Sequence, residues 1–209
     1  MIKMIIFYIC IILALPSLVI FLFLLFKPSS ASSKKINTSD GLNQEEQDSF
    51  IKETNAYRTR AKALPLSWDN NLAKSAQAWV DFLCENEGCK MRHPSTESEK
   101  NKYLNNNTYG QNLAWFEGYP GSPAESVKNW GPVECKQYDP NSPTRGTAGG
   151  EVGHFTQLVW KSTKSQGCGA ATNGKETLYA CNYSPAGNVI YNGGFSLYNE
   201  NVKKPNPCS

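Results

Sequence analysis

Six cysteines outside an apolar N-terminal run constrain this fold more than any other feature of the chain. They are Cys84, Cys89, Cys135, Cys168, Cys181 and Cys208, while the seventh, Cys10, lies within the run. An even number of thiols in a domain of this size is typical of disulfide-bonded proteins in an oxidising compartment. The chain contains no Cys-x-x-Cys pair, which argues against a zinc site of that type.

Two strand-like segments flank the tripeptide Asn173-Gly174-Lys175 and predict a β-hairpin. A type I′ turn on its first two residues would place Cys168 opposite Tyr179. A type II′ turn on Gly174-Lys175 places Cys168 opposite Cys181 instead. Directly opposed residues are close enough to form a disulfide, so we predict the Gly174-Lys175 turn together with a Cys168–Cys181 bond.

The other two disulfides are predicted from position. Cys84 and Cys89 lie on either side of a turn at Gly88, so their proximity favours a bond between them. Cys135 and Cys208 remain, and we pair them by elimination.

The uncharged run Met4–Phe26 predicts entry into the secretory pathway. It is long enough to span a bilayer as a helix and longer than the apolar part of an ordinary signal peptide. Ser29-Ser30-Ala31 nevertheless offers a cleavage site, so an uncleaved anchor and a cleaved signal peptide both stay open. Either way we expect an extracellular or cell-surface protein, held to the membrane through residues 4–26 if they are retained.

The chain after the apolar run is long enough for one domain. We divide it into residues 1–26 (signal or anchor), 27–42 (flexible stalk), 43–200 (folded domain) and 201–209 (tail). After residue 31 there are 19 basic and 18 acidic side chains. This balance argues against nucleic acid as a partner.

Capping patterns and apolar periodicity predict four helices. The first begins at Asn43, which has Glu46 three residues later as in a capping box, and its buried face is Phe50, Tyr57 and Ala61. The second follows Asp69 as N-cap, with a buried stripe of Leu72, Ala76, Val80 and Leu83.

The third predicted helix begins at Ser122-Pro123 and ends at Gly131-Pro132, and the fourth carries residues 155–160. Residues 94–108 are polar and rich in asparagine, so we expect a surface loop there. Helices with strands between and after them favour an α+β fold in which helices cover both faces of a sheet.

Four strings of residues resemble the CAP superfamily of cysteine-rich secretory proteins, antigen 5 and pathogenesis-related 1 proteins, also called SCP domains. The strings are Leu64-Pro65-Leu66-Ser67-Trp68-Asp69, Tyr109-Gly110-Gln111-Asn112-Leu113-Ala114, Gly153-His154-Phe155-Thr156-Gln157-Leu158-Val159-Trp160 and Cys181-Asn182-Tyr183-Ser184-Pro185-Ala186-Gly187-Asn188. The resemblance implies a three-layer α-β-α sandwich of the CAP type, preceded here by the N-terminal apolar segment.

The resemblance also implies a central cleft with two histidines and two acidic residues. The histidine positions fall on His93 and His154, and the acidic positions on Gln111 and Glu134. Gln111 departs from the family pattern because it is a neutral amide. Glu134 stands four residues after Trp130 where the family has three.

Two imidazoles and a carboxylate are ligands for a divalent metal, so His93, His154 and Glu134 form a candidate site for zinc or another divalent ion. Gln111 removes one negative charge from this cleft and cannot act as a base. We expect the metal to bind weakly and no cofactor to be obligatory.

The sequence favours a binding protein over an enzyme. The chain has no Gly-x-Ser-x-Gly elbow, and Ser95 near His93 is the one candidate for a Ser-His pair.

The resemblance implies a small lipid or sterol as ligand. Phe116 and Tyr119 are our candidates to line an apolar pocket, whereas Trp115 and Trp130 are expected in the core, like most large aromatic residues between helices. A surface protein-interaction or defence role is the alternative, and a peptidase-like hydrolase is the third.

Asn37, Asn106 and Asn182 each begin an Asn-x-Ser/Thr sequon. We expect these asparagines to be open to glycosylation in the secretory pathway.

Overall fold

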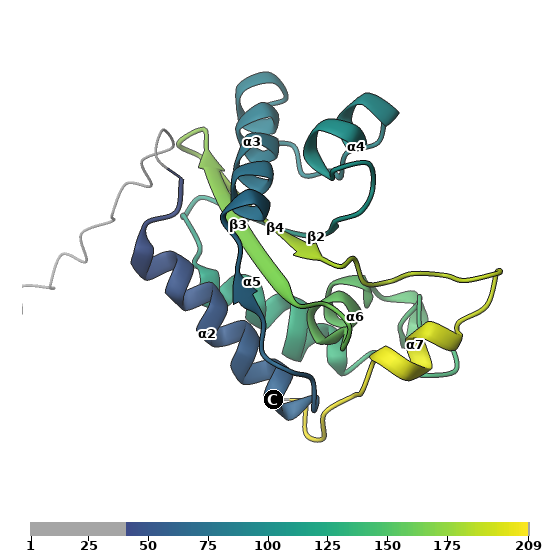
Figure 1. The fold of residues 1–209 in the computed structure, drawn as a ribbon. Coiled ribbons are helices and arrows are strands. Elements are labelled where there is room, and N and C mark those ends of the chain that lie inside the picture. Colours follow the sequence, from purple (N-terminus) through teal and green to yellow (C-terminus); the bar gives the residue numbers. More distant parts are fainter. Residues whose placement is uncertain (1–40, 209) are drawn as a thin grey trace, which may run out of the picture. The chain divides into compact units, whose positions relative to one another are not determined.

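A four-stranded sheet with the order β1-β3-β4-β2 lies at the centre of residues 41–208, the part of the chain that this computed structural model describes (Figure 1). Strand β1 (Ser67–Trp68) pairs in parallel with β3 (Ser165–Thr172). Strands β4 (Glu176–Ser184) and β2 (Gly110–Glu117) continue the sheet in antiparallel fashion. The short β1 therefore covers only the beginning of the outer edge of β3.

The predictions for the apolar run, for nearly all of the stalk and for the Asn37 sequon lie outside the described residues. Within residues 41–208, no helix has the length and apolar character that crossing a bilayer requires.

The hairpin register confirms both linked predictions. Cys168 lies directly opposite Cys181, and the two sulfurs are bonded. The turn is centred on Gly174-Lys175, where Gly174 takes a φ of +91° that glycine adopts without strain. The Cys84–Cys89 and Cys135–Cys208 disulfides are confirmed as well.

Helices cover both faces of the sheet, as Figure 1 shows. One face packs against α3 (Asn70–Asn86), on which α4 (Glu97–Tyr103) rests. The other face is covered by α2 (Gln44–Arg60), α5 (Pro123–Lys128) and α6 (Gly153–Val159). The domain is thus an α+β sandwich, and the described C-terminal part adds the short helix α7, whose bounds are Ser196–Asn201.

Alternation along the strands divides the core in two. On β4, Leu178 and Ala180 belong to the apolar cluster under α3, whereas Tyr179, Cys181 and Tyr183 belong to the cluster under α2 and α6. Successive side chains of a strand point to opposite faces, so both faces of one strand are buried.

Two glycines of β3 let α3 approach the sheet closely. A Cβ at Gly167 would lie 2.3 Å from both the backbone nitrogen of Ala73 and the backbone oxygen of Asp69. A Cβ at Gly169 would lie 2.5 Å from the backbone of Gln77. Backbone atoms cannot move aside as a side chain can, so these positions exclude every larger residue.

A side-chain amide pairs with one residue on the part of the β3 edge that β1 does not reach. Gln77 on α3 donates from Nε2 to the carbonyl of Ala170 at 2.8 Å and accepts from its N–H at 3.0 Å. The amide thereby occupies both backbone groups that a neighbouring strand would use.

A buried arginine joins α2 to α6. Arg58 is fully buried, and its guanidinium donates to the carbonyls of Leu64, Leu158, Trp160 and Thr163 at 2.7–3.2 Å. Leu158 and Trp160 end α6, where the backbone carbonyls have no partner within the helix and carry partial negative charge. Burial lowers the pKa of Arg58 to about 10, so the side chain remains a cation at neutral pH.

The first two helices begin and pack as predicted. Asn43 and Glu46 form a capping box at α2, and Asp69 accepts from two backbone N–H groups at the start of α3. The predicted buried faces are confirmed for both helices. The loop prediction for residues 94–108 is wrong over α4, which begins with a second capping box between Thr96 and Glu99.

The predicted end of the third helix is also wrong. Beyond α5 the helical path continues through Gly131-Pro132 as a π-helix, η1 (Asn129–Val133), and one more turn carries Glu134. A π-helix has one more residue per hydrogen-bonded turn than an α-helix. A proline fits here because the wider turn relaxes the clash that ends an α-helix.

We predict that Gly167→Ala destabilises the domain by about 3 kcal/mol, because its methyl group overlaps the α3 backbone. Urea unfolding of the oxidised protein measures this loss. Gly194→Ala is the control, since a Cβ there meets its nearest atom at 3.6 Å. Equal stability of the two variants would contradict close packing of α3 on β3.

Candidate functional site

A chain of hydrogen bonds holds the ring of His93. Its Nδ1 contacts Gln111 Oε1 at 2.9 Å, Gln111 Nε2 donates to Asn182 Oδ1 at 3.0 Å, and Asn182 Nδ2 donates to the carbonyl of Tyr103 at 3.3 Å. The carbonyl only accepts, so each amide orientation is fixed in turn. His93 Nδ1 therefore carries the proton, and in the neutral ring Nε2 holds the lone pair.

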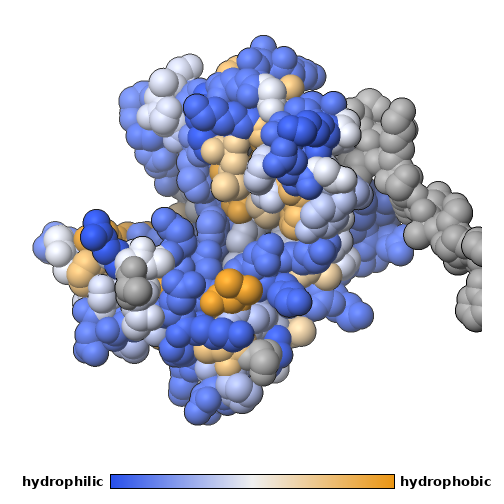
Figure 2. Space-filling model, turned by 180° about the vertical axis from the view of Figure 1, so that it is seen from behind, coloured by the Kyte–Doolittle hydropathy of each residue, from blue (hydrophilic) through white to orange (hydrophobic). Residues whose placement is uncertain are grey.

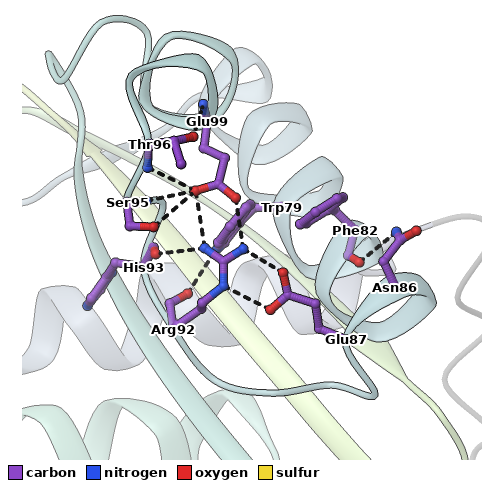
Figure 3. Close-up of polar contacts among 9 residues, drawn as sticks. All are labelled: Trp79, Phe82, Asn86, Glu87, Arg92, His93, Ser95, Thr96 and Glu99. Atoms are coloured by element: carbon purple, nitrogen blue, oxygen red, sulfur yellow. Dashed lines mark hydrogen bonds and ion pairs between the residues drawn. The ribbon is translucent and has the colours of Figure 1, made fainter.

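The backbone of His93 is held by an arginine clamp (Figure 3). Arg92 pairs with Glu87 and Glu99, and its guanidinium lies 4.8 Å from the ring centre of Trp79. Arg92 also donates to the carbonyl of His93 at 3.3 Å. The Arg92 hydrogen bond holds the pKa of Glu99 well below its usual range. The clamp fixes the loop between α3 and α4 and so places His93.

Ser95 does not form the Ser-His pair that its position near His93 suggested. Its hydroxyl donates to Glu99 at 3.3 Å, and its backbone N–H donates to the same carboxylate at 2.9 Å. The side chain thus belongs to the clamp and to the cap of α4.

His154 is held by a carboxylate. Its Nδ1 lies 2.6 Å from Glu134 Oε1, while Glu134 Oε2 accepts from the N–H of Phe155 at 3.0 Å. The ring of Trp130 stacks on His154 with centres 6.3 Å apart. A carboxylate on Nδ1 turns Nε2 of the histidine outward from the pair.

The π-helix explains how Glu134 reaches His154. The extra residue after Trp130 would rotate an α-helix by about 100° per residue and move the carboxylate off this face. The π-turn takes up one residue without that rotation, so Glu134 arrives at the first turn of α6. The backbone thus accommodates the extra residue between Trp130 and Glu134, and the contact between Glu134 and His154 is kept.

Two consecutive residues of β2 bring the histidines together. Gln111 binds the ring of His93, and Asn112 donates to the carbonyl of His154 at 3.1 Å. Figure 2 shows a hollow between the part formed by α3 and α4 and the part that carries α7. Burial in the cleft lowers the pKa of His93 and a proton on His154 lowers it further, while the hydrogen bond to Gln111 opposes this shift.

The predicted metal ligands supply fewer free donor atoms than a tetrahedral protein zinc site uses. Both oxygens of Glu134 are bonded within the protein, so the carboxylate orients His154 and is not free to be a ligand. Two histidine Nε2 atoms remain, whereas zinc takes three or four protein ligands. Among residues 41–208, no three His, Cys, Asp or Glu side chains are arranged to hold a metal ion.

The predicted lipid-binding aromatics contact each other, with ring centres 5.6 Å apart, but they differ in exposure. Phe116 is buried in the core 5.8 Å from the ring of Tyr179, and Gly121 packs directly against it. Tyr119 is 54% exposed on the turn after β2. Trp130 is buried as predicted, but the prediction for Trp115 is wrong, because 41% of its surface is exposed near the end of the edge strand β2.

A groove that the sequence did not indicate lies between α2 and α5. It has a volume of about 500 Å³. Its lining residues are Glu53, Tyr57, Arg60, Ala124, Glu125, Val127, Lys128, Pro132 and Lys136. The two helices are about 70 residues apart in the chain, so no local sequence pattern predicts the groove.

The sequons differ in access. Asn106 is exposed, on a turn with a φ of +56°. Asn182 is fully buried, and its amide nitrogen donates to Tyr103. A glycan at Asn182 does not fit the folded domain.

Comparison with known proteins gives consistent matches. A family model described as the cysteine-rich secretory protein family, CAP, matches residues 51–183. Pathogenesis-related protein PR-1 of Medicago truncatula is 31% identical over 175 residues, 82% of this chain and 92% of the relative. Pathogenesis-related protein 1C of Nicotiana tabacum is 31% identical over 148 residues, 70% of this chain and 79% of the relative. The cysteine-rich venom protein of Tityus serrulatus is 32% identical over 153 residues, 71% of this chain but only 34% of that longer protein.

Solved structures share the fold. The structure of BmVAL-1 superposes with a TM-score of 0.56 at 25% identity, over 71% of this chain and 81% of that one. A crystal structure of NaASP2 with Zn²⁺ gives a TM-score of 0.54 at 20% identity, over 81% of this chain and 91% of that one. At this identity the second match shows the fold alone, and the zinc is a property of that protein.

We predict that Gln111→Glu strengthens Zn²⁺ binding about 10-fold, because a carboxylate on Nδ1 makes His93 a better ligand. Calorimetric titration of metal-free protein measures the affinity, and His93→Ala removes the gain. Equal affinity of Gln111→Glu and the unchanged protein would show that His93 is not part of any metal site.

We also predict that the free energy of unfolding falls as the pH drops below about 6.5. Folded His93 takes up its proton at a lower pH than the unfolded residue, because burial lowers its pKa. The unfolded state therefore binds more protons in this window, and the contribution is fully present only above it. Urea unfolding between pH 5 and pH 7 should show a smaller slope for His93→Gln than for the unchanged protein.

Proposed function

Because the chain belongs to the cysteine-rich secretory protein (CAP) family, we propose that it is a secreted, non-enzymatic binding protein for a long-chain anionic amphiphile of the fatty-acid class. The groove between α2 and α5 is the binding site. Residues 1–26 act as signal or anchor, residues 27–42 as a stalk, residues 43–200 as the binding domain and residues 201–209 as a tail.

The walls of the groove support an apolar chain as ligand. Tyr57 and Val127 are buried side chains on facing helices, and Ala124 and Pro132 extend the apolar surface along α5 and η1. Gly131 packs within contact of the Tyr57 ring, which closes the floor between the helices. A volume of about 500 Å³ lies within the range of small-molecule sites.

The rim of the groove supports an anionic head group. Arg60, Lys128 and Lys136 outnumber Glu53 and Glu125 among the charged residues that line it. Fatty acids combine an alkyl chain with one carboxylate, and a cationic rim stabilises that carboxylate. A sterol has no such charge, so this groove favours a fatty acid over a sterol.

The single observation that carries the proposal is this juxtaposition of apolar walls and basic rim in one groove. A protein-interaction or defence role has only the family likeness behind it. A hydrolase gains no support either, because Ser95, the candidate nucleophile, is bonded to Glu99 and not to His93.

We predict that Ala124→Phe lowers the affinity for hexadecanoic acid at least about 10-fold, because the ring fills the groove from an exposed helix position. Displacement of bound cis-parinaric acid by hexadecanoic acid measures the affinity.

Ala78→Phe is the matched control. It adds the same ring to an exposed position on α3 that lines a second, more polar cavity of about 450 Å³. Loss of binding in Ala78→Phe with retention in Ala124→Phe would place the ligand in the second cavity. Absence of displaceable binding in the unchanged protein would refute the proposed function.

A further inference from the structure

An uncharged loop with exposed apolar side chains lies between β4 and α7. No charged residue occurs from Ser184 to Asn199. Within this stretch the exposed fractions are 41% for Val189, 53% for Ile190 and 62% for Tyr191, with Phe195 at 39%. Four large apolar residues in seven positions on a protein surface mark an interaction site rather than core.

The base of this loop is fixed on α6. Asn188 accepts from the hydroxyl of Thr156 at 2.7 Å and donates to the carbonyl of Gly153 at 2.8 Å. Gly187 donates to the side chain of Gln157 at 2.8 Å. These bonds hold the base of the loop, so the apolar tip has a defined position beyond it.

The tip is a tight turn that points its side chains outward. Tyr191 and Gly194 form an isolated bridge around Asn192 and Gly193, which have φ values of +49° and +73°. Figure 1 shows that the segment before α7 projects from the side of the sandwich. In Figure 2 the part that carries α7 shows apolar groups among polar ones.

Exposed lysines lie next to both ends of the segment 184–201, which contains the loop. The backbone of Lys164 donates to the carbonyl of Ser184, and that of Lys161 donates to the carbonyl of Asn201 at the end of α7. Lys203 follows two residues later. Among the described residues none of these lysines forms an ion pair, and Glu200 is the one acidic residue between Ser184 and Lys203.

We propose that residues 186–195, the apolar loop, insert into the interface of a lipid bilayer that contains anionic phospholipids. Aliphatic side chains enter the acyl boundary, and aromatic residues such as Tyr191 favour the headgroup level. The lysines next to the two ends of the segment 184–201 then face the phosphates, where each adds attraction to an anionic surface. A protein partner fits less well, because the tip presents no charged group to fix its orientation.

This inference is independent of the groove between α2 and α5. It assigns to the loop held on α6 a contact that brings the domain to the surface where amphiphiles are found. Ala124→Phe fills the groove and leaves the apolar loop unchanged, so a failure of one proposal is distinguishable from a failure of the other.

The test is hydrogen exchange of the full chain on bilayer discs. One set of discs contains phosphatidylcholine alone, and the other contains phosphatidylcholine with phosphatidylglycerol. On the anionic discs, we expect the amides of residues 186–195 to exchange about 10-fold more slowly in the unchanged chain than in Ile190→Asp, whose charge opposes insertion. Leu64→Asp is the control, because Leu64 is an aliphatic residue with 78% exposure outside the loop.

Three results would overturn the proposal. The first is an unprotected loop on both kinds of disc. The second is the same protection in Ile190→Asp as in the unchanged chain. The third is protection that rises with protein concentration in the absence of lipid, which would assign the loop to contact between copies of this chain.

Discussion

The buried guanidinium of Arg58 is the interaction on which the arrangement of this domain depends. It connects α2 to the C-terminal end of α6 and to the loops at Leu64 and Thr163. A cation without a buried carboxylate partner is costly in a protein interior unless several dipoles replace water. Backbone carbonyls supply these dipoles, and they are correctly placed only when α2, α6 and both loops have assembled. The position of His154 on α6 is therefore tied to the packing of the first helix.

The candidate cleft depends on the sheet in a comparable way. Adjacent residues of β2 point to opposite faces, so Gln111 and Asn112 bind residues from the two sides of the sandwich. The strand thus acts as a shared support for one loop beside α4 and one helix beside η1. Any shift of β2 along β4 by one residue would exchange these roles and separate the two imidazoles.

Local chemistry made part of this structure predictable. The caps at Asn43 and Asp69 and the opposed Cys168 and Cys181 depend on neighbours in sequence or on strand register. Helix α4 was missed because its seven residues carry no apolar stripe, although Thr96 and Glu99 form a capping box. The π-helix before Glu134 could not be predicted, since its extra residue is stabilised by the bond to Phe155 from a distant helix. The groove between α2 and α5 could not be predicted for the same reason, because it exists only between assembled helices.

The amide of Gln77 occupies the backbone groups of Ala170 on the open edge of β3 only while α3 is docked. Lifting α3 from the sheet uncovers Ala170 and the glycine-lined surface at the same moment. Partly opened forms of the domain therefore expose a sheet edge and an apolar face together, the combination that recruits strands from other molecules. The docked helix α3 therefore keeps this edge from pairing with other chains, and local opening at α3 is the step that exposes it.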